Sequence, residues 1–101
     1  MTDAPTRDQY RALARSRVDD LVSGLEAEGG RAAFAEALDL AGHLGRAIDT
    51  FHMEAIRFRM FTLDRLFASG KLPVSPDVLA IFDDVKHALE AAGFQTKSAV
   101  H

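Results

Sequence analysis

The sequence predicts an all-α protein, a three- or four-helix antiparallel bundle that is completed by homodimerisation. Hydrophobic residues recur at three- and four-residue intervals through most of the chain, which is the spacing of one face of a helix. Segment 31–69 contains no proline, and no stretch alternates polar and apolar residues as a half-buried strand would. The 101 residues are enough for one domain, which we assign to residues 1–101 with flexible tails at 1–6 and 95–101.

The first helix is predicted over Arg7–Glu28. Thr6 precedes it and Gln9 stands three residues later, which is the spacing of a capping box. One apolar stripe follows at helical intervals, formed by Tyr10, Ala14, Val18, Leu21 and Leu25. Gly29 and Gly30 are predicted to end this helix, because two consecutive glycines make continued helix costly and a turn easy.

The middle segment is predicted to form two helices, Arg31–Ala41 and Gly45–Ala68, with a bend or break at the glycines between them. Gly42 and Gly45 would each cost a continuous helix about 1 kcal/mol, which favours a break there. The alternative is one uninterrupted helix over residues 31–69, about 58 Å long, that a partner chain shares.

The last helix has the clearest start signal in the chain. Ser75 is the predicted N-cap, Pro76 occupies the first helical position, and Asp77 suits the positive end of the helix dipole. The inner stripe consists of Val78, Phe82, Val85, Leu89 and Ala92. Gly93 is predicted to cap the C-terminus, with Phe94 packing back on the last turn.

An apolar collar surrounds the second half of the third predicted helix. A helical wheel puts Phe61 on the side that is polar earlier in the segment, with Phe58 and Met60 at opposite edges. The rest of the collar is Phe51, Met53, Ile56, Leu63, Leu66 and Phe67. The first and last helices could cover it within one chain, but a small bundle has difficulty enclosing a helix on all sides. We therefore expect a partner surface, formed with a second copy of the chain. Its predicted contact residues are Phe58, Arg59, Met60 and Phe61.

Two polar residues, His52 and Arg59, fall within the apolar face of this helix, one heptad apart. Gly45 lies one heptad before His52, where a small residue lets another helix approach closely, and Asp49 lies at the edge of the face. As the alternative function, Asp49, His52 and Arg59 predict a small polar site for a metal, an anion or a polar ligand. The competing interpretation is a core histidine held by a carboxylate, with an arginine that extends to solvent. A symmetric dimer would bring two Asp49–His52 pairs together, but the sequence does not identify a cofactor.

Composition and motifs exclude several classes of function. The net charge of −3 argues against a general nucleic-acid surface, although Arg7, Arg11 and Arg15 form a row on the first helix. The absence of cysteine removes disulfides, thiolate metal sites and cysteine nucleophiles. No signal peptide or long apolar run is visible, so we expect a cytoplasmic protein without a membrane span. The preference for arginine and alanine indicates a bacterial source.

The leading hypothesis is a small helical protein–protein interaction module, acting as an adaptor, regulator or accessory subunit through the collar. No phosphate-binding loop, nucleophile elbow, paired zinc histidines or dinucleotide fingerprint is present, which favours a protein that is not an enzyme. The alternative is a small-ligand or metal-binding bundle. A third interpretation, weaker than both, is a nucleic-acid accessory protein that uses the arginine row.

Overall fold

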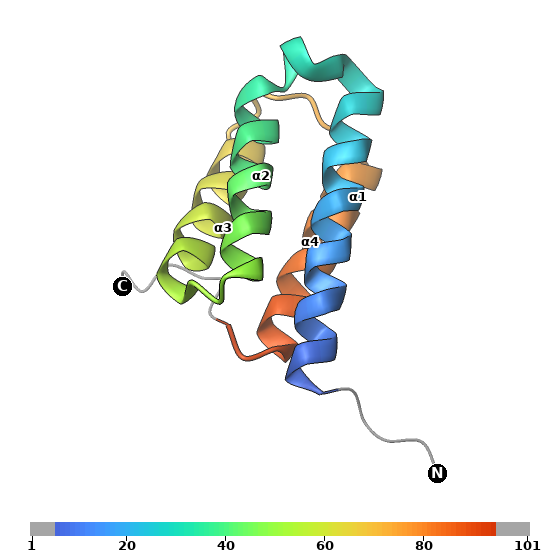
Figure 1. The fold of residues 1–101 in the computed structure, drawn as a ribbon. Helices are drawn as coiled ribbons and strands as arrows, with labels where there is room; N and C mark the ends of the chain where they lie inside the picture. Colours follow the sequence, from blue (N-terminus) through green and yellow to red (C-terminus); the bar gives the residue numbers. More distant parts are fainter. Residues whose placement is uncertain (1–5, 95–101) are drawn as a thin grey trace.

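The computed structural model describes residues 6–94, apart from the side chains at positions 30, 31 and 33 (Figure 1). These residues form four helices, α1 (Arg7–Ala33), α2 (Ala35–Asp49), α3 (Met53–Ala68) and α4 (Pro76–Ala91). No strand occurs within residues 6–94, so the predicted all-α class is confirmed. The predicted tails lie outside the described residues, except for Thr6 at the start of α1.

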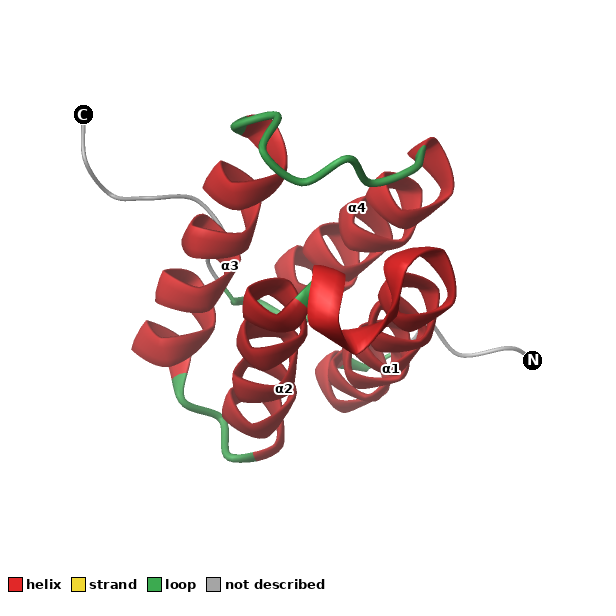
Figure 2. Cartoon of the chain, turned by 90° about the horizontal axis from the view of Figure 1, so that it is seen from above, coloured by secondary structure: helices red, strands yellow, loops and turns green. Residues whose placement is uncertain are grey.

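The four helices alternate in direction and are ordered in space as α4, α1, α2 and α3 (Figures 1 and 2). α1 packs against both α4 and α2, and α2 packs in turn against α3. α3 and α4 meet through an edge-to-face contact between the rings of Phe67 and Phe82, whose centroids are 5.1 Å apart. Among the described residues, one side of α3 therefore has no helix against it (Figure 2).

The core lies where the four helices face one another, and every helix contributes to it. The predicted stripes of α1 and α4 are buried, except that Tyr10 at the start of α1 is half-buried. The largest fully buried side chains are Val18, Leu21, Leu25, Leu44, Ile48, Ile56, Met60, Leu63, Val78, Val85 and Leu89. Because each buried aliphatic side chain contributes about 1.5–3 kcal/mol, this core is the main source of stability.

The first helix is longer than predicted, because α1 continues through Gly29 and Gly30 to Ala33. The turn occurs at Phe34, whose side chain is buried in the core and whose backbone (φ −118°, ψ 30°) begins α2. Two glycines weaken a helix by only about 1 kcal/mol each, which burial of a phenylalanine offsets. The prediction that the glycine pair ends the helix was therefore wrong.

The middle segment breaks at residues 50–52 and not at the predicted glycines. α2 runs without interruption through Gly42 and Gly45 to Asp49, so the predicted break at these residues was wrong. Phe51 has a φ of +56°, and two backbone N–H groups close the turn: that of Phe51 donates to Ile48 and that of His52 to Ala47. These two hydrogen bonds form a Schellman motif, which usually places glycine where Phe51 stands.

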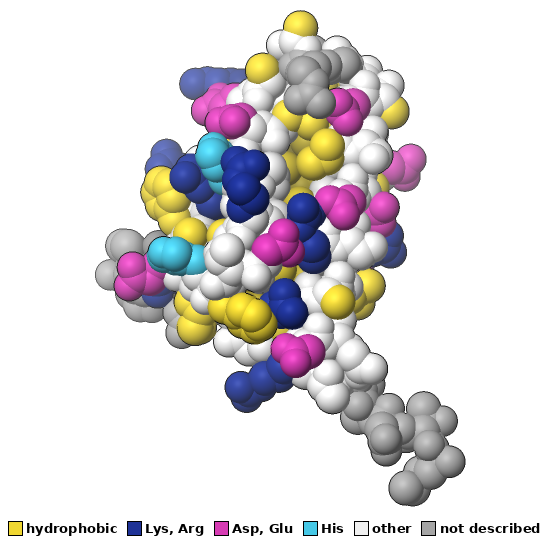
Figure 3. Space-filling view, viewed as in Figure 1, with side chains coloured by type: hydrophobic (Ala, Val, Ile, Leu, Met, Phe, Trp, Pro, Cys, Tyr) yellow, Lys and Arg dark blue, Asp and Glu magenta, His cyan; other side chains and the backbone are white. Residues whose placement is uncertain are grey.

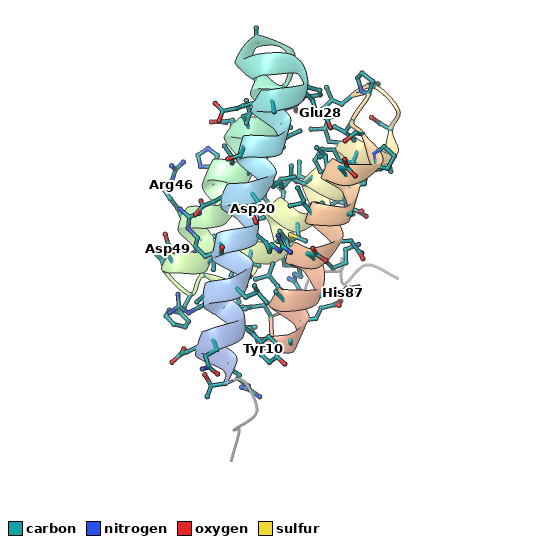
Figure 4. The ribbon with its side chains drawn as sticks, turned by 90° about the vertical axis from the view of Figure 1, so that its right-hand side faces the viewer. Tyr10, Asp20, Glu28, Arg46, Asp49 and His87 are labelled. Atoms are coloured by element: carbon teal, nitrogen blue, oxygen red, sulfur yellow. The ribbon has the colours of Figure 1, made fainter. Side chains whose placement is uncertain are left out.

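Local signals at the other helix ends are confirmed. Thr6 and Gln9 form the capping box, with hydrogen bonds of 2.7 and 3.2 Å between the backbone N–H of each and the side chain of the other. Ser75 caps α4, with Pro76 in its first turn. Gly93 has a φ of +95° and closes the C-terminus of α4 in a second Schellman motif. Figure 4 shows Glu28 of α1 beside the connector before α4, where its carboxylate accepts from the N–H and hydroxyl of Ser75.

Candidate functional site

The two sides of α3 differ sharply in exposure. One side carries Ile56, Met60, Leu63 and Phe67, which are all buried in the core. Phe58 lies on the opposite side of the helix, and 58% of its surface is exposed. The predicted collar is therefore divided into a buried half and an exposed half.

Met60 belongs to the buried half, which corrects its prediction as a contact residue. Only 1% of its surface is exposed, so it cannot touch a partner while the fold is intact. The error came from continuing one helical wheel through residues 50–52, where the turn at Phe51 resets the phase of the helix. Phe58, Arg59 and Phe61 remain on the surface or half-buried.

Four residues form a line along the exposed side of α3, which we call the outer stripe: Glu54, Phe58, Phe61 and Arg65. Their spacing of four, three and four residues keeps them on one side of a helix and equals the spacing of a coiled-coil seam. Glu54 and Arg65 are exposed and Phe61 is half-buried. The guanidinium of Arg59 lies 5.2 Å from the centroid of the Phe58 ring, and that of Arg65 lies 5.6 Å from the centroid of the Phe61 ring. Glu54 and Arg65 were not among the predicted contact residues, although their seam spacing was a usable signal.

A hollow of about 430 Å³ lies beside the outer stripe, between α3 and the start of α2. Its lining comprises Glu36, Phe58, Phe61, Thr62, Arg65, Leu66, Ser69 and Lys71. Apolar rings form part of its wall, and both signs of charge occur at its rim. The lining combines aromatic rings and an arginine, which are enriched at protein interfaces, with Glu36, Ser69 and Lys71, which are of types depleted there.

The turn between α2 and α3 adds exposed apolar surface at one end of the bundle, where hydrophobic side chains gather in Figure 3. Phe51 is 56% exposed and Met53 is 50% exposed. The left-handed backbone of Phe51 costs a non-glycine residue about 1 kcal/mol. The guanidinium of Arg11 lies 4.2 Å from the centroid of the Phe51 ring, and its buried Nε has no hydrogen-bond partner among the described residues.

The three residues of the predicted ligand site have separate partners. Asp49 lies at the end of α2 beside α1 (Figure 4), and both of its carboxylate oxygens accept from Nε of Arg15 at 3.1 Å. His52 is exposed and caps α3, with its Nδ1 3.2 Å from the backbone nitrogen of Ala55. Arg59 lies over Phe58. Among the described residues, no group of three or more histidine and acidic side chains is arranged to hold a metal ion.

The arginine row on α1 forms intramolecular contacts. Arg15 pairs with Asp19 and Asp49, and its guanidinium lies against Gly45, so a larger side chain at position 45 would displace the guanidinium. Partial burial lowers the pKa of Arg15, but hydrogen bonds and attraction from both carboxylates raise this pKa above its ordinary value. Arg17 pairs with Asp84 of α4 at 3.3 Å. These ion pairs tie α1 to its two neighbours.

A second hollow, of about 410 Å³, lies between α1 and α4. Tyr10 of α1 and His87 of α4 line this hollow, and both residues are labelled in Figure 4. Arg17 and Asp84 also line this hollow and form an ion pair, and Nδ1 of His87 lies 3.6 Å from a carboxylate oxygen of Asp83. Arg17, Asp84 and His87 therefore pair with residues of the same chain.

Each helix of the described residues is too short or too polar to cross a membrane. Comparisons with models of protein families, with curated proteins and with solved structures give no match for this chain. The outer stripe and its neighbouring hollow must therefore be interpreted from their own geometry.

Proposed function

We propose that this protein is a helical protein–protein interaction module that binds a partner helix along the outer stripe of α3. The observation that carries the proposal is Phe58, which lies opposite the core side of α3 and remains 58% exposed. Burying the exposed part of this ring in a complex would contribute about 1–2 kcal/mol. Phe61 and the stem of Arg59 extend the same apolar area.

The spacing of the surface residues favours a helix as the partner. In helix–helix packing, one side chain inserts into a hole formed by four residues of the facing helix. Phe58, Phe61, Thr62 and Arg65 have the spacing of such a hole, i, i+3, i+4 and i+7, and all four line the hollow on α3. An apolar side chain of a partner helix fits this hollow, while Glu36 and Lys71 at the rim offer polar contacts.

Position-specific photo-cross-linking tests this proposal. A photoreactive amino acid replaces Phe58 in one variant and Leu79, an exposed apolar residue of α4, in a matched control. Irradiation in the cells from which the gene comes should give a discrete protein adduct at position 58 and none at position 79. Equal labelling at both positions, or none at position 58, would contradict a contact surface on α3.

A further inference from the structure

We infer that the partner helix is α3 of a second copy of this chain, bound antiparallel about a two-fold axis between positions 59 and 60. This inference rests on the proposed function, because it names the occupant of the same surface. It adds the direction and the register of the two helices. The outer stripe supplies both, through the order of its charges and its rings.

The outer stripe is symmetric about its own midpoint. Glu54 and Arg65 lie at equal distances along the sequence on either side of the point between positions 59 and 60. Phe58 and Phe61 are also equally distant from this point. When two such helices run antiparallel about that point, each Glu54 meets Arg65 of the other copy, and each Phe58 meets Phe61. The contact is self-complementary, as a two-fold interface requires.

The charges select this arrangement over the alternatives. A parallel pair would set Glu54 against Glu54 and Arg65 against Arg65, which is repulsive. Neither residue has an oppositely charged partner within the described chain: Arg65 lies over the Phe61 ring, and no ion pair involves Glu54. Both charges are exposed and able to pair across an interface.

The hollow beside the outer stripe fits the same geometry. In the antiparallel register, the ring of Phe58 of the partner copy lies beside Phe61. It enters the hole that Phe61, Thr62 and Arg65 form together with Phe58 of the first copy. The apolar surface that the chain leaves exposed on α3 is thereby covered by the same surface of its copy. The small extent of this apolar surface predicts a dimer that dissociates on dilution.

Charge reversal tests the register in solution. Glu54→Arg and Arg65→Glu each place two like-charged pairs in the dimer, so each variant alone should dimerise about tenfold or more weakly than the unmodified chain. An equimolar mixture restores attraction at both ends and should form a mixed dimer as tightly as the unmodified chain, measured by sedimentation equilibrium. A mixture that is no tighter than either variant alone would overturn the register. Circular dichroism checks that both variants remain helical.

Cysteine cross-linking distinguishes the direction, because the chain has no cysteine of its own. In the antiparallel dimer, Glu54→Cys mixed with Arg65→Cys should form a disulfide between chains. Either variant alone should not, since like positions lie about 16 Å apart along the axis. Cross-links within each separate variant, with no disulfide between the two different variants in the mixture, would overturn the antiparallel arrangement. Photo-adducts at position 58 with a different protein, and none with a second copy, would overturn self-association but leave the proposed function standing.

Discussion

Alanine at the two glycines of α2 has different expected effects on stability, because only one glycine lies against another helix. An added Cβ at Gly42 meets no heavy atom within 4 Å, so Gly42→Ala should keep the full gain in helix propensity, about 1 kcal/mol. An added Cβ at Gly45 would lie 2.9 Å from both Cζ and Nη1 of Arg15. That separation is too short for van der Waals contact, so the arginine must move.

Moving Arg15 disturbs its ion pair with Asp49, in which Nε lies 3.1 Å from both carboxylate oxygens. Partly exposed ion pairs of this kind contribute about 0.2–1 kcal/mol. Gly45→Ala should therefore stabilise the protein by about 0–0.8 kcal/mol, less than Gly42→Ala. In a domain of this size, the full gain at Gly42 corresponds to a rise in melting temperature of about 4–8 °C.

Urea unfolding followed by circular dichroism measures both substitutions, in the unmodified chain and in an Arg15→Ala background. Without the arginine, the gain at Gly45 should rise towards the gain at Gly42, because the guanidinium that the added Cβ meets is gone. Equal gains already in the unmodified chain would refute the placement of Arg15 against Gly45. A loss of stability in Gly42→Ala would refute an uninterrupted α2.

Ser75→Ala removes the N-cap of α4 and should lower the free energy of unfolding by about 1 kcal/mol; an unchanged urea midpoint would contradict the cap. His52→Ala removes the Nδ1 acceptor at the start of α3 and should cost about 0.5–1 kcal/mol in thermal unfolding, an effect that a free surface histidine would not give. Met60→Ala opens a cavity and should cost about 2–5 kcal/mol, whereas Phe58→Ala at low protein concentration should stay within about 0.5 kcal/mol of the unmodified chain. Similar losses for these last two variants would show that α3 faces the core with a different side.

Helix ends that depend on neighbouring residues could be predicted from the sequence. Thr6 with Gln9, and Ser75 with Pro76, need only partners within three residues, so the local chain determines the geometry. Gly93 is similar, because its left-handed backbone closes the last turn of α4. These elements formed where the sequence placed them.

The turn at Phe51 could not be predicted in the same way. It is a Schellman motif without glycine, so the usual sequence signal is missing, and the cation–π contact with Arg11 forms only after α1 and α2 have packed. Because this turn was not predicted, a single helical wheel was continued from the residues of α2 into those of α3. That error placed Met60 among the predicted contact residues, although it is buried.

Contacts between distant residues were also beyond the sequence pattern. Arg15 and Asp49 are 34 residues apart, and their pairing depends on the packing of α1 against α2. The arginine row therefore had the pattern of a solvated face, although Arg15 and Arg17 bridge between helices. Asp49 was assigned to a ligand site for the same reason, because its partner on α1 was not visible.

Sedimentation equilibrium of the unmodified chain is the most direct test that α3 forms a contact surface for its own copy. As the protein concentration rises, the mean mass should increase from the 11.0 kDa of one chain towards twice that value, and Phe58→Ala should weaken this increase. A mass of 11.0 kDa at every concentration, the same for both proteins, would contradict self-association through the outer stripe.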